Sequence, residues 1–269
     1  MDLELNGHAA VITGGASGIG LACARGFARE GCNIALWDLS SGVVDLAACI
    51  VSDFGVRAVG LVADVRDFAA IQSALRNTES ALGPVAHVVH AAAAGSGRFG
   101  FPFTNLNPGD WPRVLEVNIM GMVHVAQALS KGMVDRRNGT MVFLGSVAGQ
   151  IGSQTDPPYS ASKAAGFNFA QCLAKDLAPH NIRVNTVNPG MVRTPLNQKV
   201  WEAWNAQQPM EKRRSYEDWF GDKVCAVAPL GRPQETEDIA DMVAFLSSAR
   251  ANQVTGQTIN VDGGQVMRW

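Results

Sequence analysis

Tyr159 and Lys163 have the spacing in this chain that points most directly to chemistry. Because they lie four residues apart, they share one face of a helix. The ordinary pKa of tyrosine is about 10, so a tyrosine is a poor base at neutral pH, but a neighbouring ammonium group favours its phenolate form. If Lys163 stabilised the phenolate by about 4 kcal/mol, the pKa of Tyr159 would fall to about 7. The pair could then give or take a hydroxyl proton.

Ser146 precedes this pair by 13 residues and follows an apolar run. A serine in that place could hydrogen-bond the oxygen of a reacting substrate. A glycine-rich turn with Gly14, Gly18 and Gly20 lies near the start of the chain, between an apolar run and a helical stretch. Such a turn lets the backbone approach a pyrophosphate, which then faces the N-terminus of the following helix.

Asp38 closes the second apolar run, 18 residues after Gly20. An acidic residue about 20 residues beyond such a turn can accept hydrogen bonds from the hydroxyls of an adenosine ribose. It would also repel a 2′-phosphate, and no Lys or Arg stands at Ser17, Leu39 or Ser40 to hold one. We therefore expect NAD rather than NADP as the cofactor.

Short apolar runs alternate with helix-length segments along the chain. This alternation predicts βαβ units and a parallel sheet, and right-handed crossovers make that sheet doubly wound. The chain shows no linker or repeat, so we expect a single α/β domain of the Rossmann type over residues 1–269. The predicted helix after the glycine-rich turn covers about 19–30, and the predicted strands cover 8–12, 33–37, 58–62, 85–90, 140–144, 183–187 and 257–261.

The composition excludes several classes of protein. The net charge of −2 does not favour binding to nucleic acid or to an anionic membrane. The sequence shows neither a signal peptide nor an apolar run long enough to span a membrane, and its cysteines form no Cys-x-x-Cys pair, so we expect a cytoplasmic protein with reduced thiols. The charged fraction of 17%, against an average of about 25%, suggests surface buried between subunits, with a composition rich in Ala and Gly as the alternative. The five cysteines are Cys23, Cys32, Cys49, Cys172 and Cys225.

These features, in this order, resemble the short-chain dehydrogenase/reductase family over nearly the whole chain. The resemblance implies reversible hydride transfer between a nicotinamide and an alcohol or ketone carbon, without a metal. The catalytic residues that it implies are Asn118, Ser146, Tyr159 and Lys163, with Asn118 holding a water in a proton relay. The cofactor-binding residues that it implies are Gly14, Ser17, Gly18, Ile19, Gly20, Asp38, Leu39, Asp64, Val65, Ala91, Ala92, Tyr159, Lys163, Pro189, Gly190, Val192 and Thr194.

The chain departs from the family at the end of the fourth predicted strand. His90-Ala91-Ala92-Ala93 stands where family members usually carry Asn-Asn-Ala-Gly. The small residues still let the backbone pass close to a cofactor, but the asparagine hydrogen bonds that brace the sheet are lost. We expect a structural rather than a catalytic role for His90.

Residues 197–228 hold three of the six tryptophans and the basic cluster Lys212-Arg213-Arg214. In the family this position is a lid over the substrate, and a pair of ordinary surface helices is the alternative. The remaining pocket loops, 93–103 and 150–158, contain Ser96, Arg98 and Gln154 but do not identify the substrate.

The leading hypothesis is an NAD-dependent dehydrogenase of a small secondary alcohol, polyol or sugar. A 3-oxoacyl-thioester reductase is the first alternative, because Lys212-Arg213-Arg214 could bind a phosphate of phosphopantetheine or CoA. Asp38 argues against it, since biosynthetic reductases usually take NADPH. A non-catalytic nicotinamide-sensing protein is a weaker alternative, because all four implied catalytic residues are present. The resemblance, the low charge and the C-terminal segment ending in Trp269 predict a homotetramer.

Overall fold

The computed structural model describes residues 2–153 and 155–267. The two positions Gln154 and Trp269, which the sequence analysis singled out, lie outside the described residues. The described chain contains a seven-stranded parallel sheet with the strand order β3-β2-β1-β4-β5-β6-β7. This confirms the predicted doubly wound α/β fold in a single domain. The strands are β1 (Ala9–Thr13), β2 (Asn33–Asp38), β3 (Ala58–Val62), β4 (Val85–His90), β5 (Gly139–Leu144), β6 (Ile182–Pro189) and β7 (Thr258–Val261).

The strands form where the sequence is continuously apolar. Every residue of β1 and of β5 is buried, because helices cover both faces of the sheet. Strands buried on both faces lose the alternation of apolar and polar residues and become short apolar runs. Each predicted strand matches an observed one with boundaries that differ by no more than two residues.

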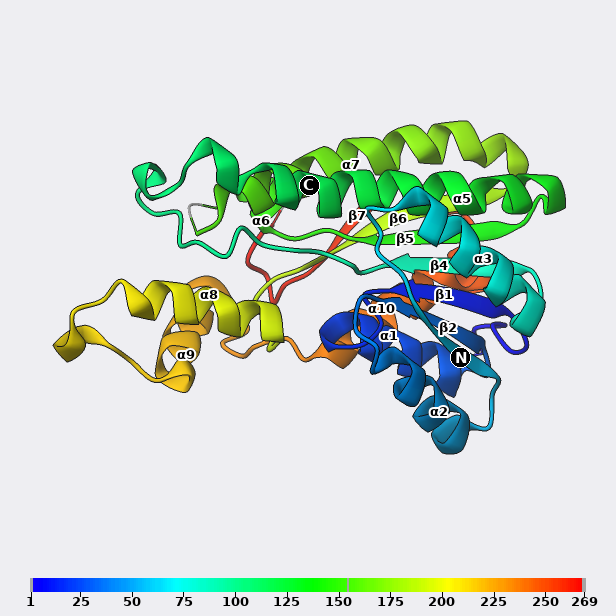
Figure 1. Cartoon of the computed structure of the whole chain (residues 1–269), viewed down its shortest axis with the longest axis horizontal. Helices are drawn as coiled ribbons and strands as arrows, with labels where there is room; N and C mark the ends of the chain where they lie inside the picture. The colour runs from blue at the N-terminus through cyan, green and yellow to red at the C-terminus, as the bar shows by residue number, and fades with distance from the viewer. Residues whose placement is uncertain (1, 154, 268–269) are drawn as a thin grey trace.

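Two layers of helices enclose the sheet (Figure 1). Helices α1 (Gly18–Arg29), α2 (Val43–Phe54) and α10 (Thr236–Ser247) pack on one face. Helices α3 (Phe68–Leu82), α5 (Gly121–Arg136) and α7 (Pro157–Leu177) pack on the other. Each layer shares a separate hydrophobic core with the sheet, so the sheet is a rigid platform for the loops at its carboxyl edge.

Helices α8 (Pro195–Ala206) and α9 (Tyr216–Val227) lie apart from this sandwich, beyond the carboxyl ends of the strands (Figure 1). They share a small aromatic core in which Trp219 and Phe220 are buried. The Trp204 and Trp219 rings lie 6.1 Å apart, and Tyr216 and Phe220 lie 5.4 Å apart. The aromatic residues of 197–228 therefore pack mainly on one another, in a unit that stands over one edge of the sheet.

The remaining elements are short. They are α4 (Pro112–Leu115), the π-helical turn Glu116–Met120, α6 (Ala148–Ile151) and several 3-10 turns. No helix within 2–153 and 155–267 combines the length and the apolar character that crossing a bilayer requires. The same residues contain no group of three or more His, Cys, Asp or Glu side chains arranged to hold a metal ion.

Candidate active site

The glycine-rich turn leaves the N-terminus of α1 without a side-chain cap. Ser17 is the N-cap residue in an extended conformation, but its side chain makes no capping hydrogen bond. By contrast, Asp67 caps α3 and Asp156 caps α7. The backbone N–H groups of the first turn of α1 are thus directed out of the helix end, where the helix dipole favours an anion. This arrangement fits the pyrophosphate of a dinucleotide.

Two glycines are needed here because the backbone approaches itself closely. Gly14 has a φ of +66°, and a Cβ atom on it would lie 2.8 Å from the backbone nitrogen of Ala92. A Cβ atom on Gly20 would collide with the carbonyl oxygen of Gly14. Only glycine allows the turn to fold this tightly against the end of β4.

Asp38 lies at the end of β2 beside the glycine-rich turn. Its Oδ2 accepts the N–H of Ala16 at 3.0 Å, and its Oδ1 accepts the N–H of Ser40 at 2.9 Å. A carboxylate offers about four acceptor positions, so Asp38 keeps capacity for two more donors. The neighbouring Leu39 is 62% exposed, which leaves an open apolar surface next to the carboxylate.

Asp64 has a local partner. It forms an ion pair with Arg66 at 2.6 Å, and the side-chain hydrogen bonds from Arg66 lower the pKa of its carboxyl group. It also accepts the N–H of Arg66, which is the local geometry of an aspartate in a turn. Val65 is buried, and its side chain packs on Gly121 at the start of α5, where a Cβ atom would not fit.

The other residues expected to bind the cofactor lie at the ends of β4 and β6. Ala91 and Ala92 donate backbone N–H groups to the carbonyl and hydroxyl oxygens of Thr13 on β1. After β6, Val192 pairs with Gln234 in an isolated bridge. The segment 189–194 ends in Thr194, which caps α8. A Cβ atom on Gly18 would lie 3.6 Å from the Thr194 methyl group, so the β6 loop and the glycine-rich turn face each other.

Ser146, Tyr159 and Lys163 come together at the carboxyl end of β5. The Ser146 side chain is hydrogen-bonded to the side chain of Tyr159. The Lys163 ammonium group lies 5.4 Å from the centre of the Tyr159 ring and donates to the carbonyl oxygen of Leu144 at 2.6 Å. Tyr159 and Lys163 therefore lie close together on α7, as predicted, and the loop after β5 contributes Ser146.

The expected lowering of the Tyr159 pKa is wrong for the protein by itself. Burial raises the pKa of Tyr159 to about 12, although the hydrogen bond from Ser146 lowers it in part. Burial also lowers the pKa of Lys163 to about 8, because its ammonium group is held in a desolvated place. Desolvation is the largest cause of both shifts, and the sequence could not reveal how deeply the two groups are buried.

Asn118 lies in the π-helical turn Glu116–Met120. Its Oδ1 accepts the N–H of Ala94 at 2.8 Å, and its Nδ2 donates to the carbonyl of Ala94 and to Ser162 Oγ. Ser162 Oγ in turn donates to the carbonyl oxygen of Tyr159 at 2.7 Å. The amide group of Asn118 therefore ties the loop after β4 to α7, and both of its N–H groups are used in doing so.

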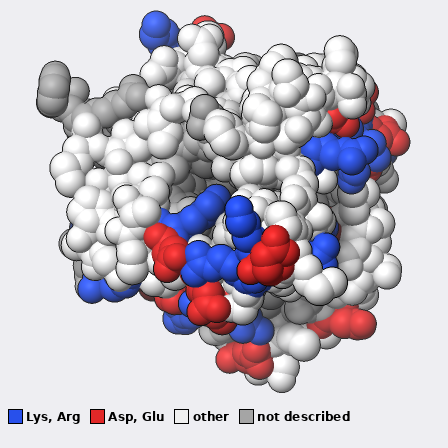
Figure 2. Space-filling view, turned by 90° about the vertical axis from the view of Figure 1, so that its left-hand side faces the viewer, with Lys and Arg blue, Asp and Glu red and all other residues white. Residues whose placement is uncertain are grey.

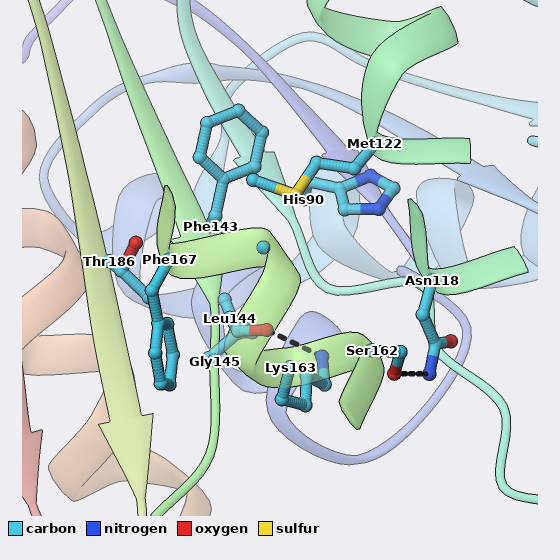
Figure 3. Close-up of a pocket in the computed structure, with 11 residues that line it drawn as sticks. His90, Asn118, Met122, Phe143, Leu144, Gly145, Ser162, Lys163, Phe167 and Thr186 are labelled. Carbon is cyan, nitrogen blue, oxygen red and sulfur yellow. Dashed lines mark hydrogen bonds between the residues drawn. The ribbon is translucent and has the colours of Figure 1, made fainter. Parts of the chain in front are cut away.

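His90 replaces the missing asparagine brace. Its Nδ1 lies 2.9 Å from Thr13 Oγ1 on the neighbouring strand β1. Burial lowers the pKa of His90 to about 3, so its ring is neutral. His90, Asn118 and Lys163 line one small cavity beneath the active site, together with Ser162 (Figure 3).

Asp156 is a residue of the site that the sequence analysis missed. Its Oδ1 accepts the N–H of Tyr159, and its Oδ2 accepts the N–H of Ser96 at 2.8 Å. It is buried, and burial raises the pKa of its carboxyl group. The signal was available, because an aspartate directly before Pro157-Pro158 is typical of a helix N-terminus.

The end of the molecule that carries α8 and α9 presents basic and acidic groups side by side, along the lower edge of a central hollow (Figure 2). Arg193 pairs with Glu217 at 2.7 Å, and Arg214 pairs with Asp222 at 2.6 Å. Arg213 donates to the carbonyl oxygen of Gln208 at 3.4 Å. Part of the basic cluster 212–214 is thus already engaged within the chain.

Comparisons with known proteins agree with this geometry. A family model described as "Enoyl-(Acyl carrier protein) reductase" matches residues 14–265. The chain is 36% identical over 265 residues to 2-(S)-hydroxypropyl-CoM dehydrogenase 3 of Xanthobacter autotrophicus, with 98% of each protein covered. It is 31% identical over 265 residues to a 3-oxoacyl-(acyl-carrier-protein) reductase of Thermotoga maritima, with 98% of this chain and 100% of the relative covered.

A solved structure is similar over its full length. The L-sorbose reductase of Gluconobacter frateurii, described as complexed with NADPH and L-sorbose, superposes with a TM-score of 0.90, at 30% identity and with 100% of both chains covered. The glycine-rich turn, the Ser-Tyr-Lys group at the end of β5 and these full-length similarities lead to one conclusion. This chain is an oxidoreductase that belongs to the short-chain dehydrogenase/reductase family.

Proposed function

We propose that the protein interconverts a small secondary alcohol, polyol or sugar and its ketone by hydride transfer, with NAD as the cofactor. The observation that carries this proposal is the group formed by Ser146, Tyr159 and Lys163, with Ser146 hydrogen-bonded to the phenol. The relatives support the substrate class, because one is named for a hydroxypropyl compound and a structural neighbour was solved with L-sorbose. In this proposal the protein is cytoplasmic and forms a homotetramer.

The proposed cofactor site uses the carboxyl edge of the sheet. Gly14, Ser17, Gly18, Ile19 and Gly20 would hold the pyrophosphate at the uncapped N-terminus of α1. The residues proposed to bind the rest of the cofactor are Asp38, Leu39, Asp64, Val65, Ala91, Ala92, Tyr159, Lys163, Pro189, Gly190, Val192 and Thr194. When it is bound, the nicotinamide supplies or accepts the hydride.

Tyr159 is proposed to hold and move the proton at the substrate oxygen. Its raised pKa keeps the phenol protonated at neutral pH, which suits the donation of a proton to a ketone oxygen during reduction. Ser146 would hydrogen-bond the same oxygen and orient it. Lys163 would place a positive charge beside the phenol, which stabilises the phenolate that remains after the proton has left.

A 3-oxoacyl-thioester reductase is the second candidate, and the similarity to the Thermotoga maritima enzyme favours it. Two features of this chain count against it. Arg214 is already paired with Asp222, which weakens the basic cluster as a phosphate site. Asp38 would repel the 2′-phosphate of NADPH. On the same argument, this chain is proposed to differ in cofactor from the L-sorbose reductase, whose structure is described as complexed with NADPH.

The decisive experiment is a panel of polyols, sugars, secondary alcohols and 3-oxoacyl thioesters, assayed with NAD, NADH and NADPH by nicotinamide absorbance. We expect turnover of an alcohol or polyol with NAD. Turnover of thioesters alone would favour the second candidate. The absence of turnover with every compound, while NADH still binds, would favour a nicotinamide-sensing protein.

Tyr159→Phe tests the proposed catalytic group because it keeps the ring and removes the hydroxyl. We expect kcat to fall by about 10²- to 10⁴-fold, while the affinity for NADH measured by fluorescence titration is retained. Tyr216→Phe is the matched control, since Tyr216 on α9 is the other of the two tyrosines. Its kcat should stay close to that of the wild type. A Tyr159→Phe enzyme with most of its activity would show that another group moves the proton.

A further inference from the structure

The His90 side chain has one bonded and one unbonded nitrogen. Nδ1 lies 2.9 Å from Thr13 Oγ1, whereas Nε2 has no hydrogen-bond partner among the described residues. Only 4% of His90 is exposed, so Nε2 does not reach bulk solvent. A buried polar atom without a partner costs free energy and is uncommon in native proteins, which points to a ligand for this nitrogen.

Thr13 Oγ1 is the hydrogen-bond partner of His90 Nδ1 and also contacts the end of β4. Thr13 Oγ1 already accepts the N–H of Ala92, at 3.3 Å. The hydroxyl of Thr13 has one donor and two acceptor positions, so it can either donate to His90 Nδ1 or accept from it. In both tautomers of the neutral ring, Nε2 is a buried polar atom that needs a partner, and a water can act as acceptor for one form and as donor for the other.

A small cavity adjoins His90. It leaves a volume of about 10 Å³ for the centre of a water-sized sphere, which is room for about one water and too little for a sugar ring. Figure 3 shows His90 and Lys163 on two walls of this cavity, with Thr186 on a third. Thr186 Oγ1 is also buried and has no hydrogen-bond partner among the described residues. A cavity lined by unsatisfied polar atoms favours occupancy by water.

Lys163 is the charged group of this cavity. Its ammonium group has three N–H donors, and the structure gives one of them a protein acceptor, the carbonyl oxygen of Leu144. The titratable groups beside it are Tyr159 on its own helix and His90 on β4, and Asp156 lies beyond Tyr159 at the start of α7. Strand β5, which supplies Leu144, has no titratable side chain.

We propose that this cavity binds one ordered water, which is hydrogen-bonded to His90 Nε2 and accepts an N–H of Lys163. His90 is then a positioning residue, because it fixes the water that supports the ammonium group beside Tyr159. The family resemblance assigns a relay water to Asn118 and gives no role to His90. This inference rests on the proposed function, because it assigns to Lys163 the charge that serves Tyr159.

The water stabilises the charged form of Lys163. Burial already lowers the pKa of Lys163 to about 8, so the ammonium group loses its proton within the working range of an enzyme assay. Loss of a hydrogen-bond acceptor lowers that pKa further. The kcat for ketone reduction, which needs the positive charge, should therefore decline at a lower pH when His90 no longer holds the water.

Three substitutions distinguish the role of His90 Nε2 from that of Nδ1. His90→Phe keeps a ring and removes both nitrogens. His90→Gln can place its amide group, which has both a donor and an acceptor, near the position of Nε2, whereas His90→Asn reaches only the position of Nδ1. We expect the alkaline decline of kcat to move down by about one pH unit in the Phe and Asn enzymes and to stay at the wild-type pH in the Gln enzyme.

A purely structural brace predicts the opposite order, because Asn would then rescue the enzyme and Gln would not. That result would overturn the proposal, and the Asn and Gln pair decides the question even if the Phe variant does not fold. A crystal structure of the wild type should show density within hydrogen-bond distance of both His90 Nε2 and Lys163 Nζ. Its absence would also overturn the proposal. Because this second readout requires no turnover, failure of the proposed function is recognised separately, by an inactive wild type.

Discussion

Asp38 connects two parts of the backbone and still presents a charge to the carboxyl edge of the sheet. Its two oxygens bind the N–H groups of Ala16 and Ser40, so the carboxylate is fixed in position before any cofactor arrives. A fixed carboxylate costs little additional entropy when it binds two hydroxyl groups. The same charge would meet a 2′-phosphate at close range and repel it.

Asp38→Asn should therefore change the cofactor preference, and it also replaces one of the two oxygens that accept backbone N–H groups by a donor. We expect kcat/KM for NAD to fall by about tenfold, because hydrogen bonds to a charged acceptor are stronger than those to a neutral one. The value for NADP should rise relative to that for NAD. Asp45→Asn is the control, since Asp45 is an exposed acidic residue in the first turn of α2. Steady-state kinetics of each enzyme with NAD and with NADP measures this preference. A wild-type enzyme that prefers NADP would contradict the assignment of NAD as the cofactor.

The first turn of α7 links the stability of the fold to the position of Tyr159. Asp156 caps this helix and also holds the N–H of Ser96, so one buried carboxylate fixes both the helix and the loop opposite it. Asp67 caps α3 in a similar way, with the N–H groups of Ala69 and Ala70, but on an exposed surface. The two caps therefore provide a matched pair.

Asp156→Ala should lower both stability and turnover. A lost N-cap costs about 1 kcal/mol, which corresponds to about 2–4 °C in Tm for a domain of this size. We expect kcat to fall by at least about tenfold as well, because the cap holds the backbone of Tyr159 itself. Asp67→Ala should lower Tm by a similar amount with an unchanged kcat. Equal kcat values for both variants would show that the α7 cap has only a structural role.

At the level of elements, the sequence predicts what depends on local pattern. The strands are apolar runs because helices cover both faces, and the first helix begins at Gly18, after its glycine-rich turn. The π-helical turn was not predictable, because Asn118 is held there by Ala94, which is distant in sequence. The contact between His90 and Thr13 depends on the pairing of β4 with β1, which no local pattern encodes.

The whole molecule carries two buried neutral histidines. Burial lowers the pKa of both His87 and His90 to about 3. His87 lies between His8 and Thr140, at 2.9 Å and 2.8 Å, and the charges of His8 and Arg183 lower its pKa further. The unfolded chain binds protons with the ordinary histidine pKa of about 6.5, so unfolding takes up protons below that pH.

The free energy of unfolding should therefore be highest above about pH 6.5 and fall steadily as the pH drops towards 3. His87 alone can account for about 5 kcal/mol across that range. Urea denaturation at several pH values measures the slope of the free energy of unfolding against pH. His87→Gln should flatten it, whereas His180→Gln, at a partly exposed histidine, should leave it unchanged. Identical slopes in all three proteins would mean that other groups cause the acid sensitivity.

The predicted homotetramer concerns the outer face of α7. Its inner face is buried against the sheet, while its outer face exposes small and uncharged residues that include Ala164, Ala165, Asn168 and Gln171. Small residues let two helices approach closely across a two-fold axis, and burial of apolar surface contributes about 25 cal/mol per Å². Such an interface would also stiffen the helix that carries Tyr159 and Lys163.

Sedimentation at micromolar concentration should give four times the mass of the chain. Ala165→Glu should dissociate the assembly, because a two-fold axis brings the two new carboxylates close together in a desolvated interface. Its kcat should fall along with its mass, since α7 loses its support. Ala69→Glu is the matched control, as it places the same charge on an exposed position of α3 and should leave both mass and kcat unchanged. A monomeric wild type with full activity would rule out this role for α7.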